Sequence, residues 1–219
     1  MIFERLRRSP RPGAEPARWV VLDVETTGLD PHDDHLLAVA AVALHREGDA
    51  LRVQLADSFE AVLRQALPAA APPDRHNILL HGIGVGAQRN GAEPAAVLRA
   101  FADWAGAAPR LGFHVAFDRA VIERHWRQQR AVLGTPPAVA WIDIEPLAAL
   151  AHPEVKARAL DEWLDHFGIG CLQRHNAAAD ALATAELLLR LWPRLRAECG
   201  GRVAGLAKLA DGARWLRRS

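Results

Sequence analysis

Residues 19–30, W-V-V-L-D-V-E-T-T-G-L-D, contain the most informative pattern in this sequence. The run W-V-V-L-D-V-E is apolar with polar residues entering at alternate positions, which predicts a buried β-strand. Residues two apart in a strand point to the same face, so Asp23 and Glu25 place two carboxylates side by side. At the end of a buried strand this pair is costly unless a divalent cation binds, and the alternative is a strand end whose acids are solvated.

The segments that follow predict an α/β fold. Residues 36–45 and 50–59 flank an E-G-D turn and predict a hairpin beside the first strand, with a helix as the alternative for the alanine-rich first half. Further strands are expected at 111–114 and 139–142, and helices at 93–107, 118–133, 144–151, 160–167 with Gly168 as C-cap, and 176–191 with an end at Pro193. This order predicts a mixed sheet with helices on both faces.

The length of 219 residues, half of them hydrophobic, fits one sizeable domain. We expect a basic, Pro/Arg-rich arm at 1–17, the domain at 18–195, and a basic extension at 196–219 in which 203–216 can form a helix. The 27 Lys and Arg nearly balance the 26 Asp and Glu, so no global field attracts nucleic acid or membrane. The basic ends are either solvated tails or a local aid in gathering a polyanion.

The cysteine content and the hydropathy indicate the expected compartment. The two cysteines are far apart and outside any C-x-x-C pattern, which argues against a zinc knuckle or a disulfide framework. No uninterrupted apolar run has membrane-spanning length, and no apolar segment of a secretory signal follows the first arginines. We therefore expect a cytoplasmic protein.

A third carboxylate follows the segment F-H-V-A-F at residues 113–117. Asp118 precedes an apolar-periodic stretch and so lies at or near a helix start. Aspartate in that position is commonly an N-cap, and the alternative is a metal ligand delivered from a second element. Asp118 alone does not decide between the two.

The segment H-N-A-A-A-D at residues 175–180 adds an imidazole and a fourth carboxylate. If the helix begins near Asn176, Asp180 lies in its first turns and can reach a metal, while His175 precedes it and can reach a water molecule beside that metal. A neutral imidazole can accept a proton from water near neutral pH. The alternative is a capping or core histidine and a surface aspartate.

Taken together, these residues predict a two-metal site. Four neighbouring carboxylates repel one another unless cations lie among them. Their hard oxygen atoms suit Mg²⁺ or Mn²⁺ rather than zinc. Two such ions about 3.5–4 Å apart can activate water and stabilise a leaving 3′-oxygen, with His175 as general base. The predicted ligands are Asp23, Glu25, Asp118 and Asp180.

The segments D-V-E-T-T-G, F-H-V-A-F-D and H-N-A-A-A-D-A resemble, in this order, the three motifs of the DEDDh exonuclease family, which includes the proofreading epsilon subunit of bacterial DNA polymerase III. The similarity extends from about Trp19 to Leu191. It implies a ribonuclease-H-like fold, with a mixed five-stranded sheet flanked by helices. It also implies 3′-to-5′ removal of nucleotides as 5′-monophosphates, and it transfers the family's ligands and general base to the five residues named above.

The resemblance also extends to substrate contacts. Beside the predicted metal, the backbone N–H groups and hydroxyls of Thr26 and Thr27 can hold a terminal sugar hydroxyl. The loop H-G-I-G-V-G resembles the family's H-G-I-T segment, so His81 and Ile83 are expected to line the terminal nucleotide, and a plain loop histidine is the alternative for His81. Relatives often read G-H-N-x-x-F-D where this chain reads G-F-H-V-A-F-D, so Phe113 is expected to pack and His114 to contact the sugar–phosphate. Phe117 either stacks on a base or packs in the core.

The expected partners are single-stranded or frayed 3′ ends of DNA. RNA is the alternative substrate, since nothing in the sequence discriminates the 2′-hydroxyl, and association with a DNA polymerase is a further expectation. A non-catalytic nucleic-acid-binding or scaffold module with the same fold remains the alternative function. The retention of all four carboxylates favours the enzyme.

Overall fold

The computed structural model describes residues 15–66 and 75–216. Its centre is a five-stranded sheet with the strand order β3-β2-β1-β4-β5. The first three strands pair antiparallel, and β4 and β5 run parallel to β1. The mixed five-stranded sheet predicted from the sequence is therefore confirmed. The strands are β1 (Arg18–Thr26), β2 (Leu36–Glu47), β3 (Ala50–Val62), β4 (Arg110–Gly112) and β5 (Trp141–Asp143).

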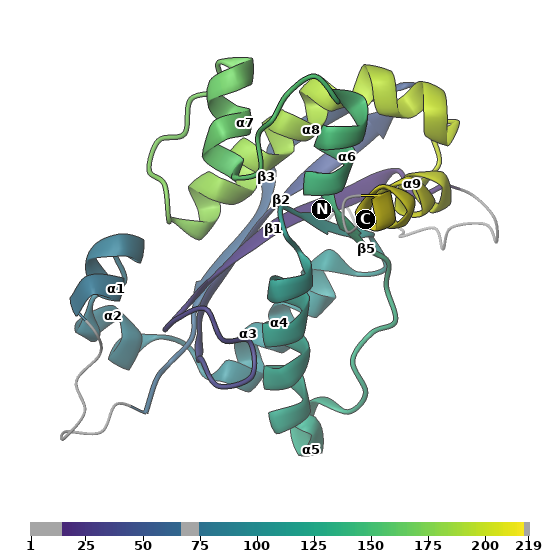
Figure 1. The fold of residues 1–219 in the computed structure, drawn as a ribbon. Coiled ribbons are helices and arrows are strands. Elements are labelled where there is room, and N and C mark those ends of the chain that lie inside the picture. Colours follow the sequence, from purple (N-terminus) through teal and green to yellow (C-terminus); the bar gives the residue numbers. More distant parts are fainter. Residues whose placement is uncertain (1–14, 67–74, 217–219) are drawn as a thin grey trace, which may run out of the picture.

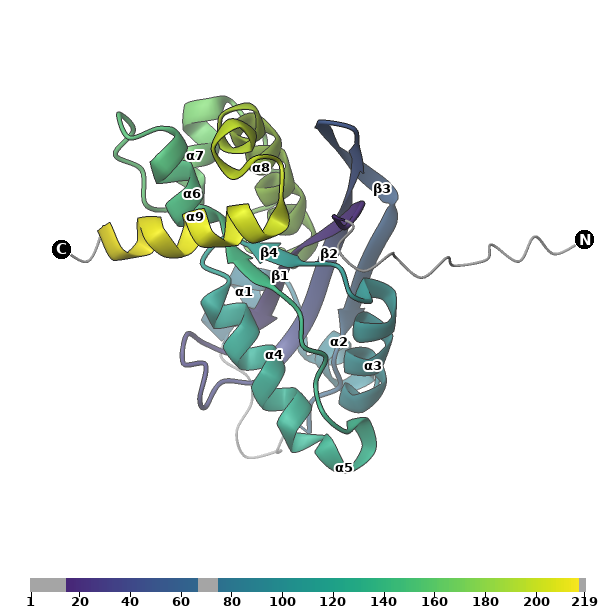
Figure 2. The same cartoon turned by 90° about the vertical axis from the view of Figure 1, so that its right-hand side faces the viewer.

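Helices cover both faces of the sheet (Figures 1 and 2). One face carries α6 (Ile144–Ala151), α7 (Leu160–Phe167), α8 (Ala177–Cys199) and α9 (Val203–Leu216). The other carries α3 (Pro94–Ala105), α4 (Ala116–Gln128) and α5 (Arg130–Leu133). The short helices α1 (Arg75–His81) and α2 (Val85–Asn90) follow β3 in the chain. Each helix in the described part of the chain is too short or too polar to cross a bilayer.

The central strand β1 contributes alternate side chains to two hydrophobic clusters. Trp19 and Val21 pack with α6, α7, α8 and α9, whereas Val20 and Leu22 pack with α3 and α4. The period of two in a strand continues along β1, so Asp23 and Glu25 share the face of Trp19 and Val21. The two carboxylates therefore point toward the layer that contains α8.

Residues 36–45 form a strand, which confirms the hairpin rather than the helix. The first nine residues of β2 are all buried, because β2 lies between two strands and has helices on both faces. A strand covered on both faces shows a continuous apolar run instead of alternation, and such a run does not distinguish strand from helix. The two strand partners of β2 explain why its alanines, good helix formers, adopt an extended conformation.

Several element boundaries differ from the predictions. Helices α1 and α2 were not predicted, because the glycines of H-G-I-G-V-G indicate a loop. The Pro/Ala-rich segment 68–74, for which the sequence predicts a loop, lies outside the described residues. The predicted end of α8 at Pro193 is wrong, since α8 continues to Cys199. The predicted helix 118–133 is divided at Gln129 into α4 and α5, and β5 begins at Trp141 rather than Val139.

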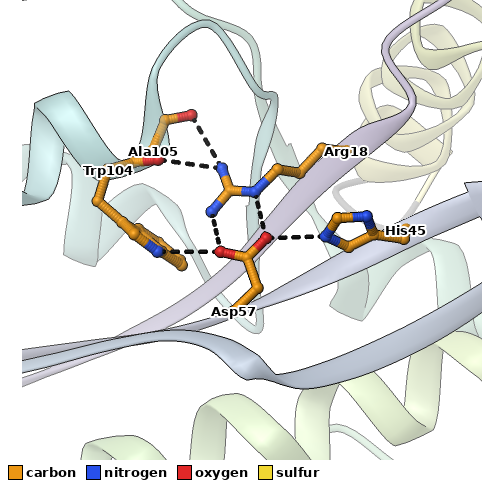
Figure 3. Close-up of polar contacts among 5 residues, drawn as sticks. All are labelled: Arg18, His45, Asp57, Trp104 and Ala105. Carbon is orange, nitrogen blue, oxygen red and sulfur yellow. Dashed lines mark hydrogen bonds and ion pairs between the residues drawn. The ribbon is translucent and has the colours of Figure 1, made fainter. Parts of the chain in front are cut away.

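A polar cluster fixes the edge strand β3 at the end of the sheet where β1 begins (Figure 3). The pairing of β2 with β3 shifts register between Val42 and Ala43, so β3 bulges near Asp57. Both oxygens of Asp57 accept hydrogen bonds from the Arg18 guanidinium, and Trp104 of α3 donates to the same carboxylate. The cluster therefore links β1, β3 and α3 at a point where the strand ladder is interrupted.

Candidate active site

Asp23 and Glu25 lie at the carboxyl end of the central strand, next to the start of α8. Burial, together with the charges of Asp180 and Asp118, raises the pKa of Glu25 from its ordinary value of 4.5 to about 8. Burial also raises the pKa of Asp23 well above its ordinary range, with contributions from Asp118, Glu25 and Asp180. These mutual effects show that carboxylates from three distant segments meet within electrostatic range.

Asp118 is the third residue of α4 and is only 4% exposed. Because α4 begins at Ala116, the alternative that Asp118 caps this helix is wrong. Burial raises the pKa of Asp118 to about 7, although hydrogen bonds from the backbone of Asp118 and Val24 oppose the rise. The hydrogen bond from the Val24 backbone places Asp118 beside β1.

His175 precedes α8, and Asp180 lies in its first turn. The Asn176 side chain caps α8 by accepting a hydrogen bond from the Ala179 N–H at 3.1 Å, so His175 is not the cap. The backbone N–H of His175 instead donates to Asp180 Oδ2 at 3.1 Å. His175 is exposed, so its ring is accessible to solvent and substrate.

His175 and His114 share an unusual backbone conformation. Their φ angles are 59° and 57°, and they are the non-glycine residues with positive φ in the described part of the chain. This region is rarely occupied by residues with a Cβ, and such outliers cluster at functional sites. Both residues also line one cavity.

The cavity has a volume of about 570 Å³ and opens at the carboxyl end of β1. It brings together most of the residues predicted from the sequence. Those lining it are Asp23, Glu25, Thr26, His81, His114, Phe117, His175 and Asp180. Asp118 is buried and is not among the lining residues, whereas Thr27 lines a neighbouring cavity of about 470 Å³ that His81 also lines.

The turn after β1 is held by its own hydrogen bonds. Thr27 Oγ1 donates to Asp34 Oδ1 at 2.8 Å, and Thr26 Oγ1 donates to the Gly28 carbonyl at 2.5 Å. A Cβ at Gly28 would lie 2.5 Å from Asp34 Oδ2, so the turn requires glycine for this close approach. The two threonine hydroxyls therefore stabilise the turn, and substrate contact by Thr27 would require a rearrangement.

Ile83 lies in the short loop between α1 and α2 and is not among the residues that line the cavity, whereas His81 does line it. His81 ends α1, is 4% exposed, and accepts a hydrogen bond from the Ile83 N–H through Nδ1 at 3.0 Å. Burial lowers the pKa of His81, which favours the neutral ring. Phe113 is buried in the cluster under α6, α7 and α8, as expected for packing, while Phe117 packs partly against the cluster on the opposite face.

The carboxylate cluster has the chemistry of a divalent-metal site. Glu25 Oε1 is buried without a hydrogen-bond partner, and the raised pKa values show more negative charge than the surroundings neutralise. Hard oxygen donors of this kind suit Mg²⁺ or Mn²⁺. As they stand, no three His, Cys, Asp or Glu side chains among the described residues are close enough to surround an ion. Metal binding would therefore require these side chains to move closer together.

Sequence reasoning missed two arginines. Arg174 lines the cavity and donates hydrogen bonds to Asp180 Oδ1 and to Asp161 Oδ1 of α7. Arg174 directly precedes the segment H-N-A-A-A-D, and this adjacency is the sequence feature that could have placed it at the site. Arg214 of α9 bonds Asp143 Oδ2 at 2.7 Å, and no sequence pattern links these two residues, which are 71 positions apart.

The Arg214–Asp143 pair supports the backbone beside Asp118. Asp143 is 7% exposed, and its Oδ1 accepts hydrogen bonds from the backbone N–H groups of His114 at 2.9 Å and Glu145 at 3.2 Å. Asp143 thereby caps α6 and holds His114 in its left-handed conformation. The C-terminal helix is thus connected, through one buried carboxylate, to the wall of the cavity.

The family model of RNase_T exonucleases matches residues 20–188. The chain belongs to this exonuclease family. The PolC-type DNA polymerases III of Latilactobacillus sakei and Bacillus subtilis are similar to this chain. Each is 30% identical to it over 177 residues, and the match covers 81% of this chain. The match covers only 11% and 12% of those two polymerases.

Solved structures confirm the ribonuclease-H-like fold of this exonuclease-family chain. Escherichia coli exonuclease I in complex with a dA16 oligonucleotide matches with a TM-score of 0.64 and 20% identity, over 84% of this chain and 44% of that one. The cell-death related nuclease CRN-4 matches with a TM-score of 0.67 and 14% identity, over 80% of this chain and 63% of that one. At such identities the likeness concerns the fold alone.

Proposed function

We propose that this chain is a metal-dependent 3′–5′ exonuclease that hydrolyses phosphodiester bonds at the 3′ end of DNA and releases nucleoside 5′-monophosphates. One observation carries the proposal. Carboxylates from β1, α4 and α8, far apart in sequence, raise one another's pKa beside a cavity that also contains the His175 ring. Family membership and the DNA polymerase names of the relatives support the same activity.

The residues that would hold the metal are Asp23, Glu25, Asp118 and Asp180. When bound, two divalent ions supply a Lewis acid for the scissile phosphate and lower the pKa of water. Asp118 and Asp180 are 4% and 5% exposed, so their oxygens are placed by the protein rather than by solvent. Asp180 is at present paired with Arg174, so metal binding would first require a rearrangement of this carboxylate.

His175 would accept the proton from the attacking water. Its backbone is fixed by the bond from its N–H to Asp180 Oδ2, which places the base next to a metal ligand. A positioned general base contributes roughly 10²–10⁴-fold in rate. The proposed substrate contacts are Thr26, His81, His114 and Phe117, all of which line the cavity.

The test uses a 5′-labelled oligonucleotide with Mn²⁺ or Mg²⁺, supplied as single-stranded DNA, duplex DNA, DNA with a mismatched 3′ end, or RNA. We expect a ladder that shortens from the 3′ end, ranked by how easily each end frays. EDTA should abolish digestion. The RNA arm decides whether the 2′-hydroxyl is tolerated.

Asp23→Ala and His175→Ala should each lower the rate at least a hundredfold, since one removes a proposed metal ligand and the other the base. Asp33→Ala, which removes an exposed acid from the turn after β1, is the matched control and should leave the rate unchanged. Full activity in folded Asp23→Ala protein would refute the site.

A further inference from the structure

Arg174 places a permanent positive charge inside the carboxylate cluster. Its Nη1 donates to Asp180 Oδ1, and its Nε donates to Asp161 Oδ1. The side chain of Asp180 is 8% exposed and that of Arg174 is 27% exposed, so the pair is partly shielded from water. Guanidinium remains charged at all accessible pH values, and its planar fork can bridge two carboxylates.

The same guanidinium acts on the rest of the cluster. Its charge opposes the rise in pKa of both Asp23 and Glu25, whereas the neighbouring acids promote that rise. Arg174 is thus the cation that partly neutralises the cluster in this structure. Without it, the four acids would face one another with less compensation, which is unfavourable at short range.

Both oxygens of Asp180 are engaged in this arrangement. Oδ1 receives Arg174 Nη1 and, at 3.5 Å, the thiol of Cys171, while Oδ2 receives the His175 N–H at 3.1 Å. Of these three donors, the Arg174 guanidinium carries the charge. An incoming divalent ion therefore competes with Arg174 for Asp180. The Arg174 guanidinium also pairs with Asp161 of α7, so it would keep one carboxylate partner after leaving Asp180.

We propose that Arg174 is a built-in counter-ion that occupies Asp180 until a divalent metal ion binds, and that metal binding displaces the guanidinium from Asp180 while Asp161 retains it. This inference rests on the proposed function, because it requires Asp180 to be a metal ligand. Arg174 is a positioning residue in this scheme. It holds the metal-free cluster together and weakens metal binding, since the ion must replace an existing charge-assisted contact.

The first test is calorimetric titration of Mn²⁺ into the metal-free full chain. Arg174→Gln should bind Mn²⁺ about tenfold more tightly than the wild type, the factor that corresponds to one charge-assisted hydrogen bond of about 1.4 kcal/mol. Arg52→Gln removes the same charge from an exposed pair with Glu47 and should leave the affinity unchanged. A misfolded variant would bind metal more weakly, so tightening cannot arise from structural damage.

The second test follows the arginine itself by NMR. The Arg174 Nε–H resonance is identified by its loss in Arg174→Gln, and the Arg18 Nε–H, bonded to Asp57 far from the cavity, is the internal reference. On titration with Mg²⁺ the Arg174 resonance should shift with the binding isotherm, whereas the Arg18 resonance should not.

The outcomes separate this inference from the function on which it rests. If the wild type binds Mn²⁺ but Arg174→Gln binds with equal or lower affinity, or if the Arg174 resonance stays fixed while Mg²⁺ binds, the counter-ion role is overturned and the exonuclease remains. If neither protein binds Mn²⁺ and Asp23→Ala keeps full nuclease activity, the metal site itself is refuted.

Discussion

Asp57 offers the sharpest test of what stabilises this fold, because one carboxylate receives four hydrogen bonds (Figure 3). Arg18 Nε and Nη2 donate at 2.7 and 2.8 Å, His45 Nε2 lies at 2.8 Å, and Trp104 Nε1 donates at 3.1 Å. The Arg18 guanidinium also stacks on the Trp104 ring at 4.4 Å. Substitution of Asp57 therefore disturbs three strands and α3 at once.

The magnitude follows from the pKa of Asp57. Hydrogen bonding to Arg18, reinforced by His45, lowers this pKa from 3.8 to about 2 against the opposing effect of burial. The difference corresponds to on the order of 2 kcal/mol of folding free energy at neutral pH. Asp57→Asn keeps the side-chain volume but loses the charge, so we expect it to lower the free energy of unfolding by about 2 kcal/mol at pH 7.

The pH dependence has a definite sign. Because the folded-state pKa lies below the unfolded value, the stabilisation is complete above pH 3.8 and is lost as the pH falls toward 2. At pH 3 the difference between wild type and Asp57→Asn should shrink to about half of its value at pH 7.

The measurement is urea denaturation followed by circular dichroism at pH 7, 4 and 3. Glu47→Gln is the control, since Glu47 and Arg52 form an equally short pair at 2.8 Å whose side chains are 64% and 68% exposed. Exposed pairs contribute about 0–1 kcal/mol, so this variant should remain within about 0.5 kcal/mol of the wild type. Equal effects of the two variants, or a difference for Asp57→Asn that does not change with pH, would contradict the reasoning.

Two further predictions concern the candidate site. Burial raises the pKa of Glu25 to about 8 and that of Asp118 to about 7, so between pH 5.5 and 8 the folded metal-free protein retains protons that the unfolded chain has released. The free energy of unfolding of the metal-free protein should fall by on the order of 2–5 kcal/mol from pH 5.5 to pH 8. Mn²⁺ should raise the melting temperature more at pH 8 than at pH 5.5. A metal-free protein with a higher melting temperature at pH 8 would contradict this prediction. Arg214→Ala leaves the carboxylate of Asp143, which is 7% exposed, without its cation and should cost about 2 kcal/mol in urea unfolding, with partial recovery in Arg214→Lys. No loss in Arg214→Ala would show that the Arg214–Asp143 pair does not stabilise this wall of the cavity.

Local patterns predicted much of the fold. Helices α6 and α7 have the predicted bounds, and Gly168 ends α7 in the left-handed conformation expected of a C-cap. Such features depend on side-chain periodicity and on the backbone preferences of single residues. Both can be recognised from residues that are neighbours in the sequence. The β1 strand and the hairpin were predictable for the same reason.

Other elements depend on contacts that no local pattern records. Pro193 lacks the N–H of a helix interior, yet α8 continues past it because Trp192 and Leu195 are buried on the sheet side. Residues 75–81 form a helix although the glycines that follow indicate a loop. At Pro193 tertiary packing outweighs the local preference, whereas α1 buries only His81.

The acids and the histidine of the candidate site are identifiable from the amino-acid sequence, and the strand period predicts that Asp23 and Glu25 share one face. Which charges meet depends on the packing of the helices. Arg174 stands against Asp180 and Asp161, and Arg214 against Asp143, because helix packing brings distant segments together. A charge interacts strongly within a few ångströms in any direction, whereas periodicity reports only on neighbours along the chain.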